Sequence, residues 1–329
     1  MNTSTAAGSS KSAVTMKRQV LQASILGTGS ALPERIVPNA YFVDELGLDT
    51  SDAWITERTG IRERRFASNG ETLVSLATEA GLRALEAAGL CPDQIDIIVL
   101  ATSTAAYRLP ASACLVQQNL LAENAVAFDI NSGCAGFEFA FDVAVRYLQS
   151  TGGNGLVIGA DLGSELCDPT DRGTVVFFGD GAGAAVISTR GGGQVLASRL
   201  HTRGNPQPVQ AKARGPITMD GRAVWNFVHQ VLPGTINELC NEAGISPADI
   251  KLVVPHQANS TMICSAIEPL HISRDRIFMN LAQYGNTLAA SIPIGLDEAL
   301  RTGRAKSGDL VLLVGFGAGL AWGGTLLRL

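Results

Sequence analysis

Short apolar runs alternate along the chain with longer segments in which apolar residues recur at helical spacing. In the first part of the chain, the apolar runs lie at residues 95–101, 125–130, 155–159 and 184–188. Helical patterns lie between them, for example over residues 72–88 and 137–150. Uninterrupted apolar strands are typical of sheets covered by helices on both faces. The pattern therefore predicts an α/β fold with mixed sheets.

The same order of elements recurs in the second part of the chain. Predicted strands there lie at residues 252–255, 277–280 and 310–314. Residues 86–99 and 241–254 also share one pattern, in which a helix ends at Ala-Gly, a proline opens a turn and a strand begins. Such joints are common in α/β proteins, so this match alone is compatible with coincidence. The shared element order favours two duplicated halves.

This interpretation divides the chain into three parts. Residues 1–17 are rich in Ser, Thr, Ala and Gly and are predicted to be a disordered extension. An N-terminal half over residues 18–190 follows, and a C-terminal half covers residues 191–329.

Composition narrows the class of protein. The 329 residues are 46% hydrophobic and 17% charged, which suits a large buried core. A net charge of −5 without a long basic run argues against nucleic acid or a membrane as partner. Six scattered cysteines without a C-x-x-C pair argue against a disulfide framework or a metal site, and favour a cytoplasmic protein. No apolar run reaches the roughly 18 residues of a transmembrane helix.

Cys134 is the leading candidate for a nucleophile. A predicted strand breaks at Gly133, and a helical pattern begins directly after the cysteine. The N-terminus of a helix stabilises an anion and favours a thiolate. The alternative is a buried thiol that only fills space, as the other five cysteines are expected to do. The flanking glycines favour the nucleophile.

Two further polar residues occupy similar joints between strand and helix. His256 follows the predicted strand at residues 252–255, at the end where open α/β sheets present ligand-binding residues. Asn286 lies in Gly285-Asn286-Thr287 and taken alone would be a turn or cap residue. Together with Cys134 they complete a Cys/His/Asn set, which suits acyl-thioester chemistry.

From about residue 23 to its C-terminus, the chain resembles the β-ketoacyl-acyl-carrier-protein synthase III family of the thiolase superfamily. Besides the Cys134 segment, the matching stretches are residues 54–62, 168–184, 256–259, 285–287 and 315–323, in family order. The resemblance implies a thiolase-like, five-layered αβαβα fold built from two duplicated halves. It also implies a homodimer.

The same resemblance implies an enzyme that condenses two thioesters. Cys134 would take the starter acyl group from an acyl-CoA. His256 and Asn286 would then stabilise a malonyl thioester as it loses carbon dioxide, giving a β-ketoacyl thioester. The backbone of Cys134, with Ala318 and Gly319, would form an oxyanion hole. The pathway would be fatty-acid initiation or the priming of secondary-metabolite synthesis, with CoA thioesters as substrates and no permanently bound cofactor.

Family motifs also assign substrate contacts. Trp54, Arg58 and Arg172 would bind the adenine and phosphates of CoA. The remaining substrate contacts would be Gly221, Arg222, Trp225, Asn259 and Phe316. Leu109 would reach into the acyl pocket of the partner subunit.

Some positions depart from the family pattern and leave alternatives open. Thr261 stands where the family often has an arginine implicated in docking an acyl carrier protein, so the malonyl group could be carried by that protein or by CoA. An acyltransferase with an oxygen or nitrogen acceptor and a non-catalytic acyl-binding subunit are the competing functions. A thiolase proper is disfavoured, because Gly317 and Gly319 stand where that branch has a second cysteine.

Overall fold

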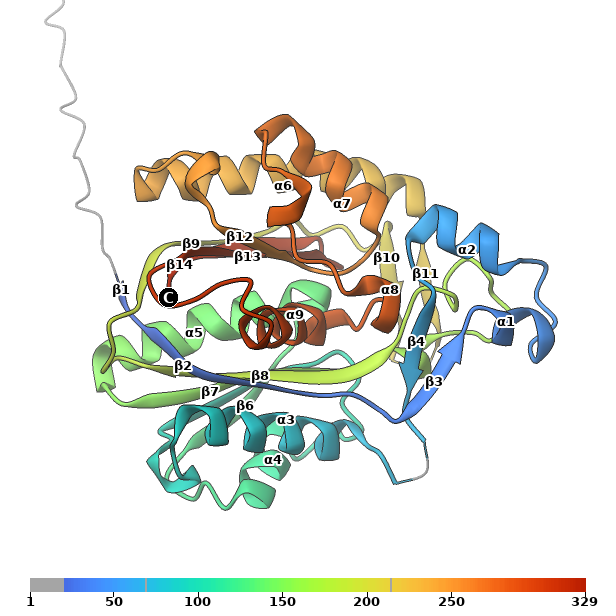
Figure 1. The fold of residues 1–329 in the computed structure, drawn as a ribbon. Helices are drawn as coiled ribbons and strands as arrows, with labels where there is room; N and C mark the ends of the chain where they lie inside the picture. The colour runs from blue at the N-terminus through green and yellow to red at the C-terminus, as the bar shows by residue number, and fades with distance from the viewer. Residues whose placement is uncertain (1–20, 69, 214) are drawn as a thin grey trace, which may run out of the picture.

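The structure is a computed structural model that describes residues 21–68, 70–213 and 215–329. The extension predicted over residues 1–17 lies outside the described residues. Two five-stranded sheets alternate with three layers of helices, which confirms the predicted five-layered αβαβα architecture (Figure 1). No helix within the described ranges is both long and apolar enough to cross a membrane.

The first sheet has a mixed strand order. Its strands, from one edge to the other, are β2 (Ser24–Ala31), β8 (Asp180–Ser188), β7 (Asn154–Leu162), β5 (Ile97–Ala101) and β6 (Val126–Ile130). Its outer face is covered by α3 (Leu73–Ala88) and α4 (Ser112–Leu120). The four apolar runs predicted as strands in this half all lie in or overlap these strands.

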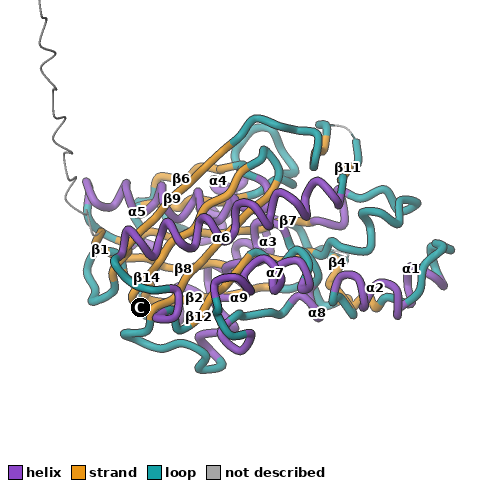
Figure 2. Tube along the Cα trace, turned by 90° about the horizontal axis from the view of Figure 1, so that it is seen from above, coloured by secondary structure: helices purple, strands orange, loops and turns teal. Residues whose placement is uncertain are grey.

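The second sheet runs β1 (Leu21–Gln22), β9 (Gln194–Thr202), β14 (Ala321–Arg328), β13 (Leu310–Gly317) and β12 (Leu252–Pro255). Its outer face is covered by α6 (Gly221–Ala243) and α7 (Ser260–Ile267), and Figure 2 shows α6 lying diagonally above the strands. Between the two sheets lie α5 (Gly136–Thr151) and α9 (Ser291–Arg301).

The two sheets share one topology. In β2–β8–β7–β5, the successive pairings are antiparallel, antiparallel and parallel. The series β9–β14–β13–β12 repeats these pairings in the same order. This agreement supports duplication. However, β1 lies before β2 in the chain and pairs with β9 in the second sheet, and the boundary near residue 190 stays a prediction.

One predicted strand is wrong. Residues 277–280 were predicted to form a strand of the second sheet. They make only a single parallel bridge, between Ile277 and Val253. After this bridge, the backbone groups of the segment form hydrogen bonds with the side chain of Gln257. Its Nε2 donates to the carbonyl of Phe278 (3.1 Å), and its Oε1 accepts from the N–H of Asn280 (3.3 Å). A side chain therefore replaces the strand partner here.

Smaller elements border the molecule near the ends of the large strands. They are β3 (Arg35–Pro38), α1 (Ala40–Asp44), α2 (Asp52–Thr59), β4 (Glu63–Phe66), β10 (Val209–Ala211), β11 (Ile217–Met219) and α8 (Leu281–Tyr284). The strands β10 and β11 form an antiparallel hairpin, and so do β3 and β4. Because these elements lie at one end of the layers, they can enclose a site without disturbing the core (Figure 1).

The middle helix α5 buries an acidic side chain between the sheets. Glu138 is fully buried; its Oε2 accepts a hydrogen bond from Thr325 Oγ1 (3.0 Å), and its Oε1 has no partner. Burial raises the pKa of Glu138 to about 8, with a smaller contribution from the neighbouring Asp142 carboxylate. The carboxyl group is therefore protonated at neutral pH.

This buried acid makes stability depend on pH. Between its ordinary pKa of 4.5 and its raised pKa of about 8, the folded protein holds a proton on Glu138 that the unfolded chain releases. This side chain therefore lowers the free energy of unfolding as pH rises through that window. We expect Glu138→Gln to remove this pH dependence. The free energy of unfolding of the variant minus that of wild type should therefore increase by up to about 4 kcal/mol when the pH is raised from 5 to 8.5.

Urea unfolding of both proteins at several pH values checks this expectation. The exposed residue Glu123, substituted as Glu123→Gln, is the matched control and should track wild type at every pH. Parallel stability curves for wild type and Glu138→Gln would contradict a protonated Glu138.

Candidate active site

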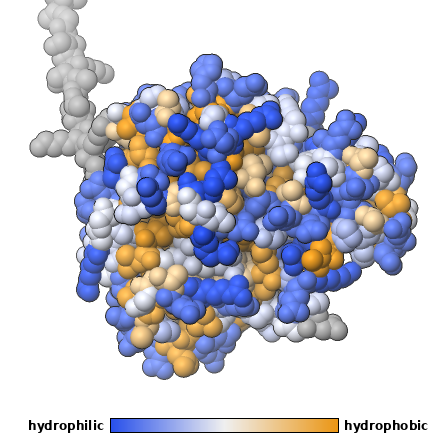
Figure 3. All heavy atoms as spheres, viewed as in Figure 1, coloured by the Kyte–Doolittle hydropathy of each residue, from blue (hydrophilic) through white to orange (hydrophobic). Residues whose placement is uncertain are grey.

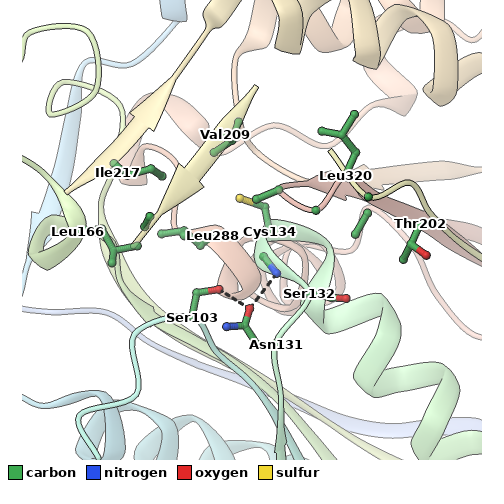
Figure 4. Close-up of a pocket in the computed structure, with 16 residues that line it drawn as sticks. Ser103, Asn131, Ser132, Cys134, Leu166, Thr202, Val209, Ile217, Leu288 and Leu320 are labelled. Carbon is green, nitrogen blue, oxygen red and sulfur yellow. Dashed lines mark hydrogen bonds between the residues drawn. The ribbon is translucent and has the colours of Figure 1, made fainter. Parts of the chain in front are cut away.

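Cys134 lies where β6 leads into α5. It is the middle residue of a 3-10 turn, Gly133–Ala135, that directly precedes the helix. Gly133 has φ +55°, a left-handed conformation that favours glycine. The turn is held by Asn131, whose Oδ1 accepts from the N–H of Gly133 (3.2 Å) and from Ser103 Oγ (3.1 Å). Figure 4 shows the sulfur pointing into the pocket from this turn.

His256 is the first residue after β12 and is almost completely buried. Its backbone N–H donates to Val314 of β13 (2.9 Å), which extends the strand pairing by one residue. The ring packs edge-on against Phe316, with 5.2 Å between centroids. Its Nδ1 lies 2.7 Å from Ser291 Oγ, at the start of α9.

Ser291 orients the imidazole. Its Oγ accepts a weak hydrogen bond from the N–H of Gln257 (3.3 Å) and can donate its hydroxyl hydrogen to Nδ1 of His256. When it does so, Nε2 carries the ring hydrogen and is a donor. Burial lowers the pKa of His256 to about 3, so the ring is neutral across the physiological range.

Asn286 is fixed through its backbone and through its amide oxygen. Its N–H donates to Phe177 (2.8 Å) and its carbonyl accepts from Gly179 (3.0 Å), in a short parallel bridge. Gly285 has φ +64°, and a Cβ there would lie 2.8 Å from the Phe177 oxygen. Because Asn286 Oδ1 accepts from the N–H of Leu288 (2.9 Å), its Nδ2 remains available as a donor.

The three predicted residues meet around the 3-10 turn Leu288–Ala290. Leu288 packs in one cluster with Cys134, and its N–H holds Asn286. The turn leads directly into Ser291, the partner of His256. It is anchored by the buried carboxylate of Asp161, which accepts from Ala289 (3.0 Å). The structure therefore brings Cys134, His256 and Asn286 together around one turn.

The charge state of Cys134 differs from the expectation. Burial, and next the carboxylate of Asp161, raise the pKa of the thiol to about 12. The helix N-terminus was expected to favour a thiolate, but desolvation outweighs it in the ligand-free site. The resting Cys134 side chain is therefore a thiol, which would have to lose its proton to act as a nucleophile.

A pocket of about 460 Å³ opens beside the sulfur. Its apolar wall includes Leu166, Val209, Ile217, Leu288 and Leu320 (Figure 4). Ser103, Asn131 and Thr202 add polar groups, and no aromatic side chain lines it among the described residues. The space suits an aliphatic chain attached to Cys134.

A second pocket leads to Asn286 from the outside. It is lined by Gly221, Trp225 and Asn259, three residues predicted as substrate contacts, together with Phe177 and Phe178. Trp225 is 37% exposed and stacks on His229 at 4.6 Å between ring centroids. Arg222 follows Gly221 in the first turn of α6 and is exposed.

Trp54 contacts two of the predicted cations. The guanidinium carbons of Arg58 and Arg172 are each 5.1 Å from the centre of its ring. Arg172 also donates to the backbone oxygen of Asp49. An indole ring with two arginines is able to bind a flat base and its phosphates.

Three residues that were predicted to contact the substrates do not have a free side chain in either pocket. Asn259 caps α7 through its Oδ1 (3.0 Å to the N–H of Met262), and its Nδ2 donates to the carbonyl of Arg58 (2.7 Å). Its amide is therefore occupied by the protein. Phe316 is buried against His256 and lines neither of these two pockets. Leu109 is 86% exposed and does not line the pocket beside Cys134.

The hairpin tip between β13 and β14 approaches the nucleophile closely. A Cβ on Gly317 would lie 2.8 Å from the Cys134 nitrogen, and one on Gly133 would lie 3.2 Å from the Ala318 nitrogen. The tip is held where Asn205 donates to Gly319 (2.9 Å). The backbones of the Cys134 turn and of the hairpin tip at Gly317 and Ala318 are therefore in close contact.

Sequence reasoning missed two supporting residues. Ser291 holds His256, and Asp161 accepts from the N–H of Ser103 (2.7 Å), from Thr104 Oγ1 (2.9 Å) and from the turn at Ala289. Neither lies in a motif with a chemical signature, because their partners are distant in the chain. In the described part of the chain, no group of three or more His, Cys, Asp or Glu side chains is placed to hold a metal ion.

Comparisons with known proteins agree with this geometry. Residues 128–204 match the family model for 3-oxoacyl-[acyl-carrier-protein] synthase III, and residues 240–329 match its C-terminal model. The curated β-ketoacyl-[acyl-carrier-protein] synthase III of Aquifex aeolicus is 44% identical over 307 residues, covering 92% of this chain and 98% of the relative.

Solved structures give the same result. A 3-oxoacyl-[acyl-carrier-protein] synthase III from Aquifex aeolicus superposes with a TM-score of 0.90 at 43% identity, covering 93% of this chain and 100% of the other. The priming β-ketosynthase of the R1128 polyketide pathway superposes with a TM-score of 0.88 at 30% identity, covering 96% and 98%. The chain belongs to the β-ketoacyl-acyl-carrier-protein synthase III family of acyl-transferring condensing enzymes, in the thiolase superfamily.

Proposed function

We propose that this protein condenses a starter acyl-CoA with a malonyl thioester and releases carbon dioxide. The observation that carries this proposal is the convergence of an enclosed thiol, Cys134, with two neutral donors, His256 and Asn286, beside the Leu288–Ala290 turn. Neutral donors stabilise a developing enolate without protonating it.

In the first step, the sulfur of Cys134 attacks the acyl carbon of the acyl-CoA. The Cys134 S–H bond and the thioester bond to CoA break, a new thioester forms on Cys134, and CoA leaves as the thiol after taking up a proton. The backbone N–H groups of Cys134 and of the hairpin tip, at Ala318 or Gly319, stabilise the tetrahedral oxyanion. The acyl chain then occupies the pocket lined by Leu166, Val209 and Ile217.

In the second step, the malonyl thioester enters past Trp225 and loses its carboxylate as carbon dioxide. The electron pair of the broken C–C bond forms an enolate, whose oxygen accepts hydrogen bonds from His256 Nε2 and Asn286 Nδ2. The carbanion carbon then attacks the acyl group on Cys134. A C–C bond forms, and the thioester bond to Cys134 breaks. The sulfur leaves as a thiolate and takes up a proton, and the β-ketoacyl thioester is released.

The substrates follow from these steps. The CoA portion of the starter would be bound by Trp54, Arg58, Arg172 and Arg222, and the contacts of both Arg58 and Arg172 with the Trp54 ring support this. The acceptor is a malonyl group carried by an acyl carrier protein or by CoA, and no permanently bound cofactor takes part. The product supports either fatty-acid initiation or secondary-metabolite priming, and we place the reaction in the cytoplasm.

A homodimer would complete the acyl pocket. Within the described residues, β6 is an edge strand with one side unpaired, and such edges invite pairing with another chain. Tyr107, Leu109, Leu121 and Val126 are large apolar residues with 49–86% exposure in this part of the chain. Contact between two copies along this edge would cover them and bring Leu109 to the partner's pocket.

Substitutions at the three central residues separate condensation from simple acyl transfer. We expect Cys134→Ala to abolish product. His256→Ala and Asn286→Ala should each slow release of carbon dioxide about 100- to 1,000-fold while acylation of Cys134 persists, because each removes an enolate donor. Release of radiolabelled carbon dioxide and product mass are the measurements. His201→Ala, at a partly buried histidine that lines neither pocket, is the control.

Two results would contradict the proposal. Acyl groups on an oxygen or nitrogen acceptor, without carbon dioxide and without dependence on His256 or Asn286, would identify an acyltransferase. Absence of both acylation and product with every acyl-CoA would identify a non-catalytic acyl-binding subunit.

Ser291 is expected to act as a positioning residue through His256. In Ser291→Ala, the proton on the ring should distribute between Nδ1 and Nε2, so that kcat for condensation falls about tenfold or more with little change in KM. Nitrogen NMR of labelled histidine should show the Nε2–H tautomer in wild type and a mixture in the variant.

The chain provides a matched control for this substitution. Ser265 holds the other ring nitrogen of a second histidine, His229, at 2.9 Å. Ser265→Ala therefore removes an equivalent bond to a histidine that stacks behind Trp225 and itself lines neither active-site pocket. Equal losses of kcat in the two variants, or an unchanged tautomer in Ser291→Ala, would refute the positioning role.

A further inference from the structure

A separate cleft of about 670 Å³ lies at the end of β12 opposite to His256. It is bounded by Lys251, the segment Arg274–Arg276 and Arg304, which follows α9. Figure 1 shows the chain between α7 and α8 passing the edge of the second sheet here, and Figure 3 shows strongly hydrophilic residues between these layers. The cleft shares no lining residue with the two pockets of the active site.

The charge in this cleft is unbalanced. Lys251, Arg274, Arg276 and Arg304 are cationic, and Asp275 is the one acidic residue among the lining residues. In the described ranges, none of the four cations forms an ion pair with a carboxylate, whereas arginines such as Arg146 and Arg301 are paired. This excess of positive charge occurs in a chain with a net charge of −5.

Two of the guanidinium groups are held in place by backbone oxygens. Arg276 Nη1 donates to the carbonyls of Ala248 (2.7 Å) and Ile250 (3.3 Å). Arg304 donates to the carbonyl of Asp275, and its guanidinium carbon lies 5.7 Å from the centre of the Phe278 ring. Backbone carbonyls orient these groups, and the one nearby carboxylate, Asp275, interacts with both arginines, so the four cations of the cleft still outnumber its acidic groups. Pre-organised arginines are the groups that bind phosphate with two parallel hydrogen bonds.

The floor of the cleft is apolar. Leu252 and Ile277 are buried beneath the cations, and Met279 is partly buried beside them. A concave site with an apolar floor and a cationic rim has room for a compact organic group as well as for its charged part. A ligand that combines both parts fits better than an inorganic ion alone.

We propose that this cleft binds a phosphate-bearing small molecule of the nucleoside diphosphate class. The phosphates would lie between Lys251, Arg274 and the two fixed arginines, and the apolar floor would contact the organic portion. The site is independent of the condensation proposed above, because it uses none of the residues that bind acyl-CoA or malonyl thioester.

Calorimetric titration of the full chain with ADP and, separately, with inorganic pyrophosphate tests the proposal. The double variant Lys251→Gln/Arg274→Gln removes two cations that make no side-chain hydrogen bond within the described residues. We expect ADP affinity to fall about tenfold or more in this variant, and binding to weaken as salt is raised. The matched control, Arg172→Gln/Arg222→Gln, removes two cations near the CoA entrance and should keep the cleft site.

The titrations distinguish a nucleotide site from a simple phosphate site and from no site at all. ADP binding that depends on Lys251 and Arg274 and exceeds pyrophosphate binding supports the proposal, and equal binding of both ligands would reduce the site to a phosphate site without an organic subsite. No binding at about 1 mM, or equal affinity in wild type and the cleft variant, would overturn it. Carbon dioxide release by the cleft variant should stay at the wild-type rate, so failure here is distinguishable from failure of the condensing function.

Discussion

Exclusion of water from the junction between the two sheets determines the chemistry of this site. Cys134 and His256 come from different halves of the chain and are enclosed by the same turn, Leu288–Ala290. Burial holds His256 neutral and the Cys134 thiol protonated. It also strengthens each hydrogen bond offered to a developing negative charge. A more open junction would hydrate both residues and weaken that stabilisation.

The duplicated architecture brings the components together. Strand β6 delivers Cys134 from one sheet, and β12 delivers His256 from the other. The Asn286 segment lies between them, fixed by its bridge to Phe178. Asp161, at the end of β7, links the first sheet to the turn before α9. The site is therefore a product of how the halves meet, and neither sheet alone contains it.

Much of this was predictable from sequence, because strong local patterns carried it. Apolar runs marked most of the large strands. Glycines next to Cys134 and Asn286, and the end of a predicted strand before His256, marked the three candidate residues. Prediction failed where contacts between residues distant in the chain determine the local structure or the charge state of a side chain. Residues 277–280 have a strand-like pattern, but Gln257 satisfies their backbone groups. Burial and Asp161 reverse the expected ionisation of Cys134, and Ser291 acquires its role only when α9 meets β12.

The central claim is that Cys134 accepts an acyl group from an acyl-CoA into the neighbouring aliphatic pocket. Intact-protein mass spectrometry after incubation with acyl-CoAs of increasing chain length, from acetyl to long-chain and aromatic, tests this most directly, with Cys134→Ala in parallel. We expect a mass gain of one acyl group in wild type and none in Cys134→Ala, with the favoured chain length identifying the starter. An adduct that persists in Cys134→Ala, or no adduct with any acyl-CoA, would contradict the claim.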